Sequence, residues 1–173
     1  AQLSGDFTVD QLLAEPETVS PLRKHDCCPI SDGAAAMIIC TVEKAKAMGK
    51  PYAVIKGIDH RIETHHVTLR DLSRSPSVEI AAEKAGVHDA PVDVAEIYAP
   101  FSHQEIIVKR ALGLDDSVAI NPSGGVLAGH LFMASGLSRV GEVAKRIIAG
   151  EYKRGVAHAT SGPCLQQNMI TVL

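Results

Sequence analysis

Asn121-Pro-Ser-Gly-Gly-Val-Leu-Ala-Gly-His-Leu-Phe-Met-Ala-Ser-Gly136 is the stretch around which the chain is organised, and it contains four glycines. Glycines at this density let the backbone adopt positive φ and approach another group closely. His130 lies on this tight loop, directly after Gly129 and before an apolar Leu-Phe-Met run. A histidine in that position can act as a base or a proton donor near neutral pH. The same residues also fit a glycine-rich turn whose histidine is hydrogen-bonded into the core, and the pattern leaves both interpretations open.

The composition indicates one aliphatic domain. A chain of 173 residues with 46% hydrophobic residues can bury one core. With 3% aromatic residues and no tryptophan, that core must be built from aliphatic side chains and alanine. A net charge of −3 without a basic block argues against a nucleic-acid-binding surface. No apolar run approaches the roughly 20 residues of a membrane span, so we expect no membrane-spanning segment.

The cysteines and histidines show neither a disulfide framework nor a metal site. The vicinal pair Cys27-Cys28 has poor geometry for pairing, and no Cys-x-x-Cys spacing occurs. We therefore expect a reduced, cytoplasmic protein. His60, His65 and His66 cluster along the sequence without further ligand spacing, so we expect a solvated loop there and no metal.

Hydrophobic periodicity and capping residues predict helices that alternate with strands. Thr8 and Ser135 are candidate N-caps, a proline follows Ser75, and glycines end several helical patterns. The expected helices are Val9–Ala14, Val42–Met48, Ser75–Gly86, Phe101–Leu112 and Ser135–Gly150, the last with an apolar stripe from Leu137 to Ile148. The expected strands are Gly33–Cys40, Ala53–Ile62, Val92–Tyr98, Gly155–Thr160 and Asn168–Leu173. This alternation predicts a layered α/β domain, and the two consecutive final strands make its sheet mixed.

Three segments carry a resemblance to one enzyme family. Asn121-Pro-Ser-Gly-Gly125 followed by Ala128-Gly-His130 resembles the catalytic histidine loop of thiolases, where the usual reading is Gly-His-Pro. Asp26-Cys-Cys-Pro-Ile-Ser-Asp-Gly-Ala-Ala-Ala36 is similar to the segment that opens the C-terminal half of sterol-carrier-protein-2-type and archaeal thiolases. Tyr98-Ala-Pro-Phe101 stands in the place of their His-Asp-x-Phe or Asn-Glu-Ala-Phe motif. The order and spacing agree over essentially the whole chain.

The resemblance implies a thiolase-like C-terminal domain of class α/β, with helices covering a mixed five-stranded sheet. Residues 1–32 would form a connecting segment with a short helix, and residues 33–173 the domain itself. An N-terminal half, on the same or a separate chain, would pack beside it and build a homodimer or another homo-oligomer. The chain opens on Ala1 rather than on methionine, so we expect a processed chain or part of a longer one.

For activity, the resemblance implies an acyltransferase of the acetyl-CoA acetyltransferase type, acting in lipid metabolism. A coenzyme A thioester is then the substrate, and no cofactor is bound tightly. Two alternatives stay open. One is a thiolase-like retro-aldolase acting on 3-hydroxyacyl-CoA, as for steroid side chains. The other is a non-catalytic subunit that binds acyl-CoA or lipid.

His130 matches the family histidine that activates a cysteine nucleophile and helps to bind the thioester oxygen. That nucleophile lies on the family's N-terminal half, and no cysteine of this chain matches its motif. Leu131 replaces the usual proline, which restores a backbone N–H donor. Tyr98 stands where the family has Asn or His. A phenol there can donate a hydrogen bond or act as an acid, and it can equally just fill the pocket.

The family's second cysteine would lie in the loop 160–167, with Ser161 nearest to its position and Cys164 three residues away. Pro100 stands where sterol-carrier-type thiolases can supply a substitute cysteine. Coenzyme A is implied to enter along the histidine loop. The residues expected to contact it or the substrate are Ser123, Gly124, Gly125, Gly129 and Phe101. His103 and His158 could reach the same cleft, but surface or core positions are expected for them.

Overall fold

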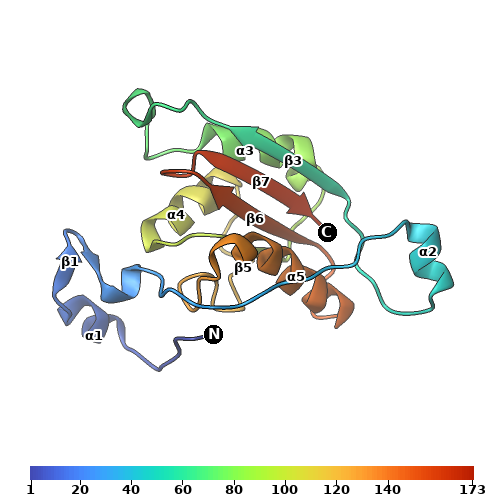
Figure 1. Ribbon diagram of the computed structural model, residues 1–173, viewed down its shortest axis with the longest axis horizontal. Coiled ribbons are helices and arrows are strands. Elements are labelled where there is room, and N and C mark those ends of the chain that lie inside the picture. Colours follow the sequence, from blue (N-terminus) through green and yellow to red (C-terminus); the bar gives the residue numbers. More distant parts are fainter.

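A computed structural model describes residues 1–173 and shows a central sheet with helices packed on it (Figure 1). The sheet has five strands in the order β3-β7-β6-β4-β5. The strands are β3 (Gly57–Ile62), β4 (Val94–Glu96), β5 (Ala119–Ile120), β6 (Gly155–Ser161) and β7 (Gln167–Val172). β7 pairs antiparallel with both β3 and β6, whereas β4 pairs parallel with both β6 and β5. The sheet is therefore mixed, which confirms the prediction of a mixed α/β domain.

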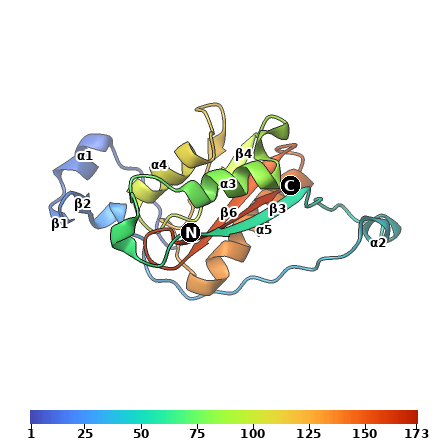
Figure 2. The same cartoon turned by 90° about the horizontal axis from the view of Figure 1, so that it is seen from above.

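Three helices cover the two faces of this sheet (Figure 2). α3 (Pro76–Ala85) and α4 (Ser102–Ala111) lie on one face, and α5 (Ser135–Ile148) lies on the other. α3 starts with its proline, which needs no N–H partner in the first turn, and ends at Gly86 with a φ of 79°. The predicted helices in these regions are confirmed.

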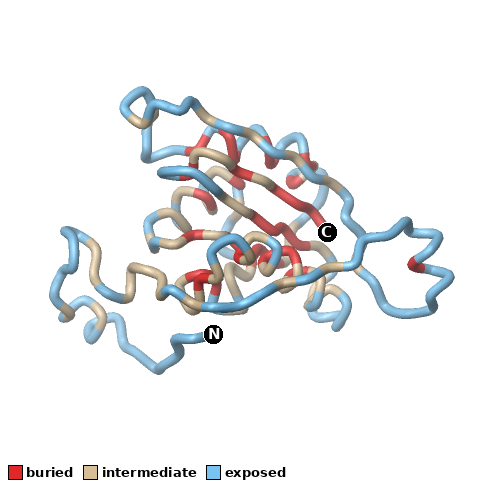
Figure 3. Tube along the Cα trace, viewed as in Figure 1, coloured by how far each residue is buried: buried red, intermediate tan, exposed pale blue.

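The core is aliphatic, as the composition requires. Its larger part lies between the sheet and the pair α3 and α4, where Val78, Ile97, Val108 and Ile170 are fully buried. A smaller cluster under α5 joins Val140 and Val143 to Val94, Ala157 and Leu173. Burying each Val, Leu or Ile side chain contributes about 1.5–3 kcal/mol. In Figure 3 the buried parts of the chain gather on the central strands and on the helices packed against them.

The N-terminal third forms an arm with little burial (Figure 3). It contains α1 (Val9–Ala14), β1 (Glu17–Val19), β2 (Leu22–Arg23) and α2 (Val42–Ala47). Thr8 caps α1 in a reciprocal capping box with Gln11, so this helix begins and ends as the sequence predicts. α2 projects away from the sheet (Figure 1). Four short 3-10 turns complete the chain, at Lys24–Asp26, Val67–Leu69, Val87–Asp89 and Phe132–Ala134.

The prediction of a buried strand at Gly33–Cys40 is wrong. This segment is extended but pairs with no strand, and Ile38 and Ile39 are 91% and 72% exposed. Its apolar run signals burial, yet the segment pairs with neither edge strand of the sheet, β3 or β5. The fifth strand of the sheet is instead β5, which the sequence analysis missed together with β1 and β2.

Smaller differences concern the ends of the elements. β3 starts at Gly57 rather than at Ala53, and β4 is shorter than predicted. The stripe on α5 is buried at Val140 and Val143, but Leu137 and Ile148 are partly exposed at its two ends. Even α5, the longest helix with 14 residues, falls short of a membrane span.

Candidate functional site

The turn that precedes His130 is held by the side chain of Asn121. This residue has a φ of 47°, a left-handed conformation that asparagine tolerates better than most residues. Its Oδ1 accepts the backbone N–H of Ile97 at 2.7 Å, and its Nδ2 donates to Glu105 Oε2 at 2.6 Å. Gly124 and Gly125 follow with φ of 89° and 61°. β5, β4 and α4 therefore fix the start of the histidine loop together.

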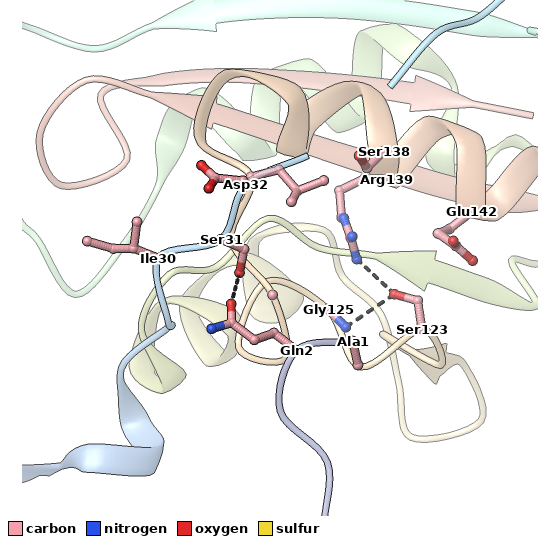
Figure 4. Close-up of a pocket in the computed structure, with 12 residues that line it drawn as sticks. Ala1, Gln2, Ile30, Ser31, Asp32, Ser123, Gly125, Ser138, Arg139 and Glu142 are labelled. Carbon is pink, nitrogen blue, oxygen red and sulfur yellow. Dashed lines mark hydrogen bonds between the residues drawn. The ribbon is translucent and has the colours of Figure 1, made fainter. Parts of the chain in front are cut away.

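A buried ion pair supports the same turn from the other side. Arg139 on α5 donates to Glu96 Oε2 at 2.5 Å and to Ser123 Oγ at 2.8 Å. The Ser123 hydroxyl in turn donates to Glu96 Oε2 at 2.7 Å. It also accepts the N–H of Gly125 at 3.2 Å, a bond drawn in Figure 4 together with that from Arg139. Glu96 is completely buried. No sequence pattern predicts this network, because Glu96 and Arg139 lie 43 positions apart.

His130 is brought against Tyr98. The phenolic oxygen of Tyr98 lies 2.7 Å from His130 Nε2, and it also lies 3.4 Å from the carbonyl oxygen of Phe132. His130 is only 7% exposed. The two residues placed in one site by the sequence analysis thus form a direct hydrogen bond between β4's end and the histidine loop.

Burial sets the protonation of both groups. It lowers the pKa of the His130 imidazole and raises the pKa of the Tyr98 phenol, because a charged form loses hydration in each case. At neutral pH the pair is therefore a neutral imidazole and a neutral phenol. Such a pair can relay a proton, because the phenol can give its own proton to Nε2 as it takes one from a neighbouring group.

The residue after His130 uses the donor that a proline would lack. The N–H of Leu131 donates to Ser135 Oγ at 2.9 Å. Ser135 is the first residue of α5, and the N-cap of this helix is Ala134. The prediction of a Ser135 cap is wrong, since its hydroxyl holds the histidine loop instead.

Cys28 is a site residue that the sequence analysis missed. Its Sγ lies 3.4 Å from His130 Nδ1, on the ring nitrogen that Tyr98 does not contact. Its backbone N–H donates to the carbonyl of Pro100 at 2.9 Å. Burial raises the pKa of the Cys28 thiol. In the sequence this region stood out only because residues 26–36 resemble a thiolase segment. The spacing of the residues does not predict the contact between Cys28 and His130.

The other candidates lie apart from this pair. Ser161 ends β6 and is exposed, and Cys164 is exposed in the β6–β7 loop with a φ of 53°. Neither forms a hydrogen bond with His130 or Tyr98. His103 lies at the surface, where its ring stacks on Phe101 at 5.9 Å. Phe101 itself is 38% exposed at the start of α4.

His158 lies in the core. It is fully buried on β6, and its Nε2 lies 2.9 Å from Asn168 Oδ1. Burial lowers its pKa to about 4. No group of three or more His, Cys, Asp or Glu side chains is arranged to hold a metal ion.

An open groove of about 630 Å³ runs beside the histidine loop (Figure 4). Three of the five residues expected to contact substrate or coenzyme A line it, namely Ser123, Gly125 and Gly129. Gly124 and Phe101 do not line it. Leu131 lines it, whereas His130 and Tyr98 do not.

Known proteins resemble this chain over most of its length. A family described as "Thiolase, C-terminal domain" matches residues 50–172. The acetyl-CoA acetyltransferase of Methanocaldococcus jannaschii is 32% identical, over 83% of this chain and 43% of its own length. Human sterol carrier protein 2 is 27% identical, over 98% of this chain and 36% of its own length. A crystal structure of the Bacillus anthracis acetyl-CoA acetyltransferase superposes with a TM-score of 0.75 at 21% identity, covering 99% of this chain and 43% of that one.

These matches agree in fold and in extent. The chain spans about half the length, or less, of the curated relatives it matches. The matched region begins before β3 and includes Tyr98, the turn at Asn121 and His130. The chain belongs to the thiolase family, and residues 50–172 are its C-terminal domain.

Proposed function

We propose that this chain is the C-terminal half of an acyl-CoA acyltransferase of the acetyl-CoA acetyltransferase type. The reaction makes or cleaves a carbon–carbon bond beside a coenzyme A thioester. The observation that carries the proposal is the buried His130 imidazole, held against the Tyr98 hydroxyl at 2.7 Å on a loop that three elements fix. Acyl transfer needs a base of this kind to activate a thiol nucleophile.

In this proposal the nucleophilic cysteine comes from an N-terminal half, and His130 takes its proton. A neutral imidazole is the required starting form, and burial of His130 favours it. Tyr98 then serves as a hydrogen-bond donor. When negative charge develops on a thioester oxygen, each well-placed donor contributes about 3 kcal/mol to the transition state.

Coenzyme A is proposed to lie along the groove beside the histidine loop. Its pantetheine arm would pass the turn at Ser123 and Gly125, where Glu96 accepts the backbone N–H of Ser123 and Arg139 donates to the Ser123 hydroxyl. The chain has no phosphate-binding loop of the glycine-lysine type. Dispersed lysine and arginine side chains would therefore meet the nucleotide phosphates.

A partner half is supported by apolar side chains around the site that nothing covers. Met133 is 97% exposed, Ile30 is 75% exposed and Phe132 is 49% exposed. Phe132 and Met133 belong to the loop of His130, and Ile30 precedes Ser31, whose hydroxyl accepts the N–H of His130. Patches of this kind mark surfaces that are buried by another protein element. We propose that the N-terminal thiolase half covers them, and that the complete protein is a homo-oligomer.

The contact between Tyr98 and His130 also favours a second candidate, retro-aldol cleavage of a 3-hydroxyacyl-CoA. In that reaction a base removes the proton of the substrate hydroxyl, and the bond between the α and β carbons then breaks. A phenol hydrogen-bonded to a neutral imidazole can relay that proton from substrate to Nε2. Tyr98 is then a catalytic residue and no longer an accessory donor.

Replacing Tyr98 by phenylalanine separates the two candidates. For acyl transfer we expect a small loss of rate, because only one hydrogen bond to the oxyanion is loosened. For retro-aldol cleavage the loss should be at least as large as that caused by His130→Ala, because a proton transfer disappears. Both variants should be assayed with a 3-ketoacyl-CoA plus free coenzyme A, and with a 3-hydroxyacyl-CoA, in protein that carries both halves. Full activity of both variants on both substrates would refute a catalytic role for this site and leave the binding-subunit alternative.

A further inference from the structure

We propose that Cys28 is a positioning residue, whose sulfur accepts a hydrogen bond from Nδ1–H of His130 and so keeps Nε2 unprotonated, the form in which it can take up a proton. The inference rests on the proposed function only in assigning Nε2 of His130 a role in catalysis. The arrangement of protons can be tested without turnover. Residues 26–31, which carry Cys28, lie outside the range 50–172 that matches the family.

The segment that carries Cys28 is bound to both halves of the site. At one end Asp26 accepts the hydroxyl of Ser102 at 2.7 Å, and the N–H of Cys28 donates to Pro100. At the other end the N–H of Ser31 donates to the carbonyl of His130 at 3.0 Å, and the N–H of His130 donates to Ser31 Oγ at 3.2 Å. The thiol is therefore fixed between the Tyr98 motif and the histidine loop.

A neutral imidazole carries one proton, so its two nitrogens must play opposite roles. Tyr98 and Cys28 are the only side chains within hydrogen-bonding distance of the nitrogens of the His130 ring. If Nε2 held the proton, the phenol would have to donate to the carbonyl of Phe132 instead, at the longer distance of 3.4 Å. If Nδ1 holds the proton, the phenol donates to Nε2 at 2.7 Å and Cys28 accepts from Nδ1.

The second arrangement is the better one. It gives the strongest donor of the group, the phenol, the shorter contact, 2.7 Å rather than 3.4 Å, and the stronger acceptor, an imidazole nitrogen. Cys28 is the residue that makes this possible, because no other side chain reaches Nδ1.

Nitrogen NMR of the whole chain labelled in its histidines tests this directly. We expect the Nδ1 signal of His130 in the range of a protonated nitrogen and the Nε2 signal in the range of an unprotonated one. The His130→Gln variant identifies the signals among those of the eight histidines. Cys28→Ala should shift the ratio of the two tautomers about fivefold towards Nε2–H, the change expected when one ordinary hydrogen bond is lost.

Two further variants make the result specific. Cys28→Ser keeps an acceptor at the same position and should retain the wild-type tautomer. Cys27→Ala removes the neighbouring thiol, which has no contact with the ring, and should also leave it unchanged. A wild-type His130 protonated at Nε2 would overturn the proposal, as would a Cys28→Ala spectrum identical to that of the wild type. Neither result would bear on whether the complete protein acts on a coenzyme A thioester, which the kinetic assays decide.

Discussion

Replacing His130 by alanine is expected to lower the rate of 3-ketoacyl-CoA thiolysis by a factor on the order of 10²–10⁴, the usual contribution of a positioned base. The imidazole is buried and neutral and lies beside the one phenol of the site. Its loss removes the group that takes the nucleophile's proton, and water is too weak a base to replace it. Most of the loss should appear in kcat, because the side chain acts on the proton rather than on binding of the coenzyme.

His103→Ala is the matched control for this measurement. It removes a histidine from the same chain, but at an exposed position on α4 whose only aromatic neighbour is Phe101. We expect its rate to equal that of the wild type. A His130→Ala enzyme that turns over as fast as the His103→Ala enzyme would show that His130 is a structural residue of a glycine-rich turn.

Acidification is expected to destabilise the domain through His158. This side chain is fully buried, and its pKa falls to about 4 from an ordinary value of 6.5. The folded state therefore favours the neutral ring, and the unfolded state binds the proton first. The stabilisation is complete above pH 6.5, is lost as the pH falls from 6.5 towards 4, and changes no further below that. The loss over this window amounts to about 3 kcal/mol.

Urea unfolding between pH 7 and pH 4 measures this loss, with His158→Gln as the comparison. Glutamine keeps an amide N–H for Asn168 Oδ1 and cannot titrate. Carboxylates such as Glu63, whose pKa is lowered, contribute to both proteins equally. The wild type should therefore have the larger free energy of unfolding at pH 7. Its advantage over the variant should shrink as the pH falls, and vanish or reverse near pH 4. A difference that is constant with pH would contradict the assignment.

Much of the fold could be predicted because its signals are local. Thr8, Pro76 and Gly86 mark helix ends by their own chemistry, and all three do so in the structure. The segment Gly33–Cys40 shows the limit of this reasoning. An apolar run reports that burial is favourable, but it does not say which chain provides the cover. β5 shows the opposite limit, since two residues are too few to leave a periodic pattern.

The sequence predicts those site residues that belong to a motif. It does not predict those that meet only through the folding of distant segments. His130 and Tyr98 were found through their motifs, and they lie within hydrogen-bonding distance. The thiol of Cys28 meets His130 across 102 positions, and the carboxylate of Glu96 meets Arg139 across 43. No spacing rule predicts such contacts. They depend on the order of the strands and on the path of the extended arm.

Calorimetric titration of the complete protein with a non-hydrolysable acyl-CoA, such as a thioether analogue, measures directly whether this domain takes part in binding coenzyme A thioesters. We expect a saturable binding heat that free adenosine at the same concentration does not produce, since the pantetheine arm must lie beside the histidine loop. Absence of any heat or thermal shift at millimolar analogue would contradict the assignment of this domain to coenzyme A thioester chemistry.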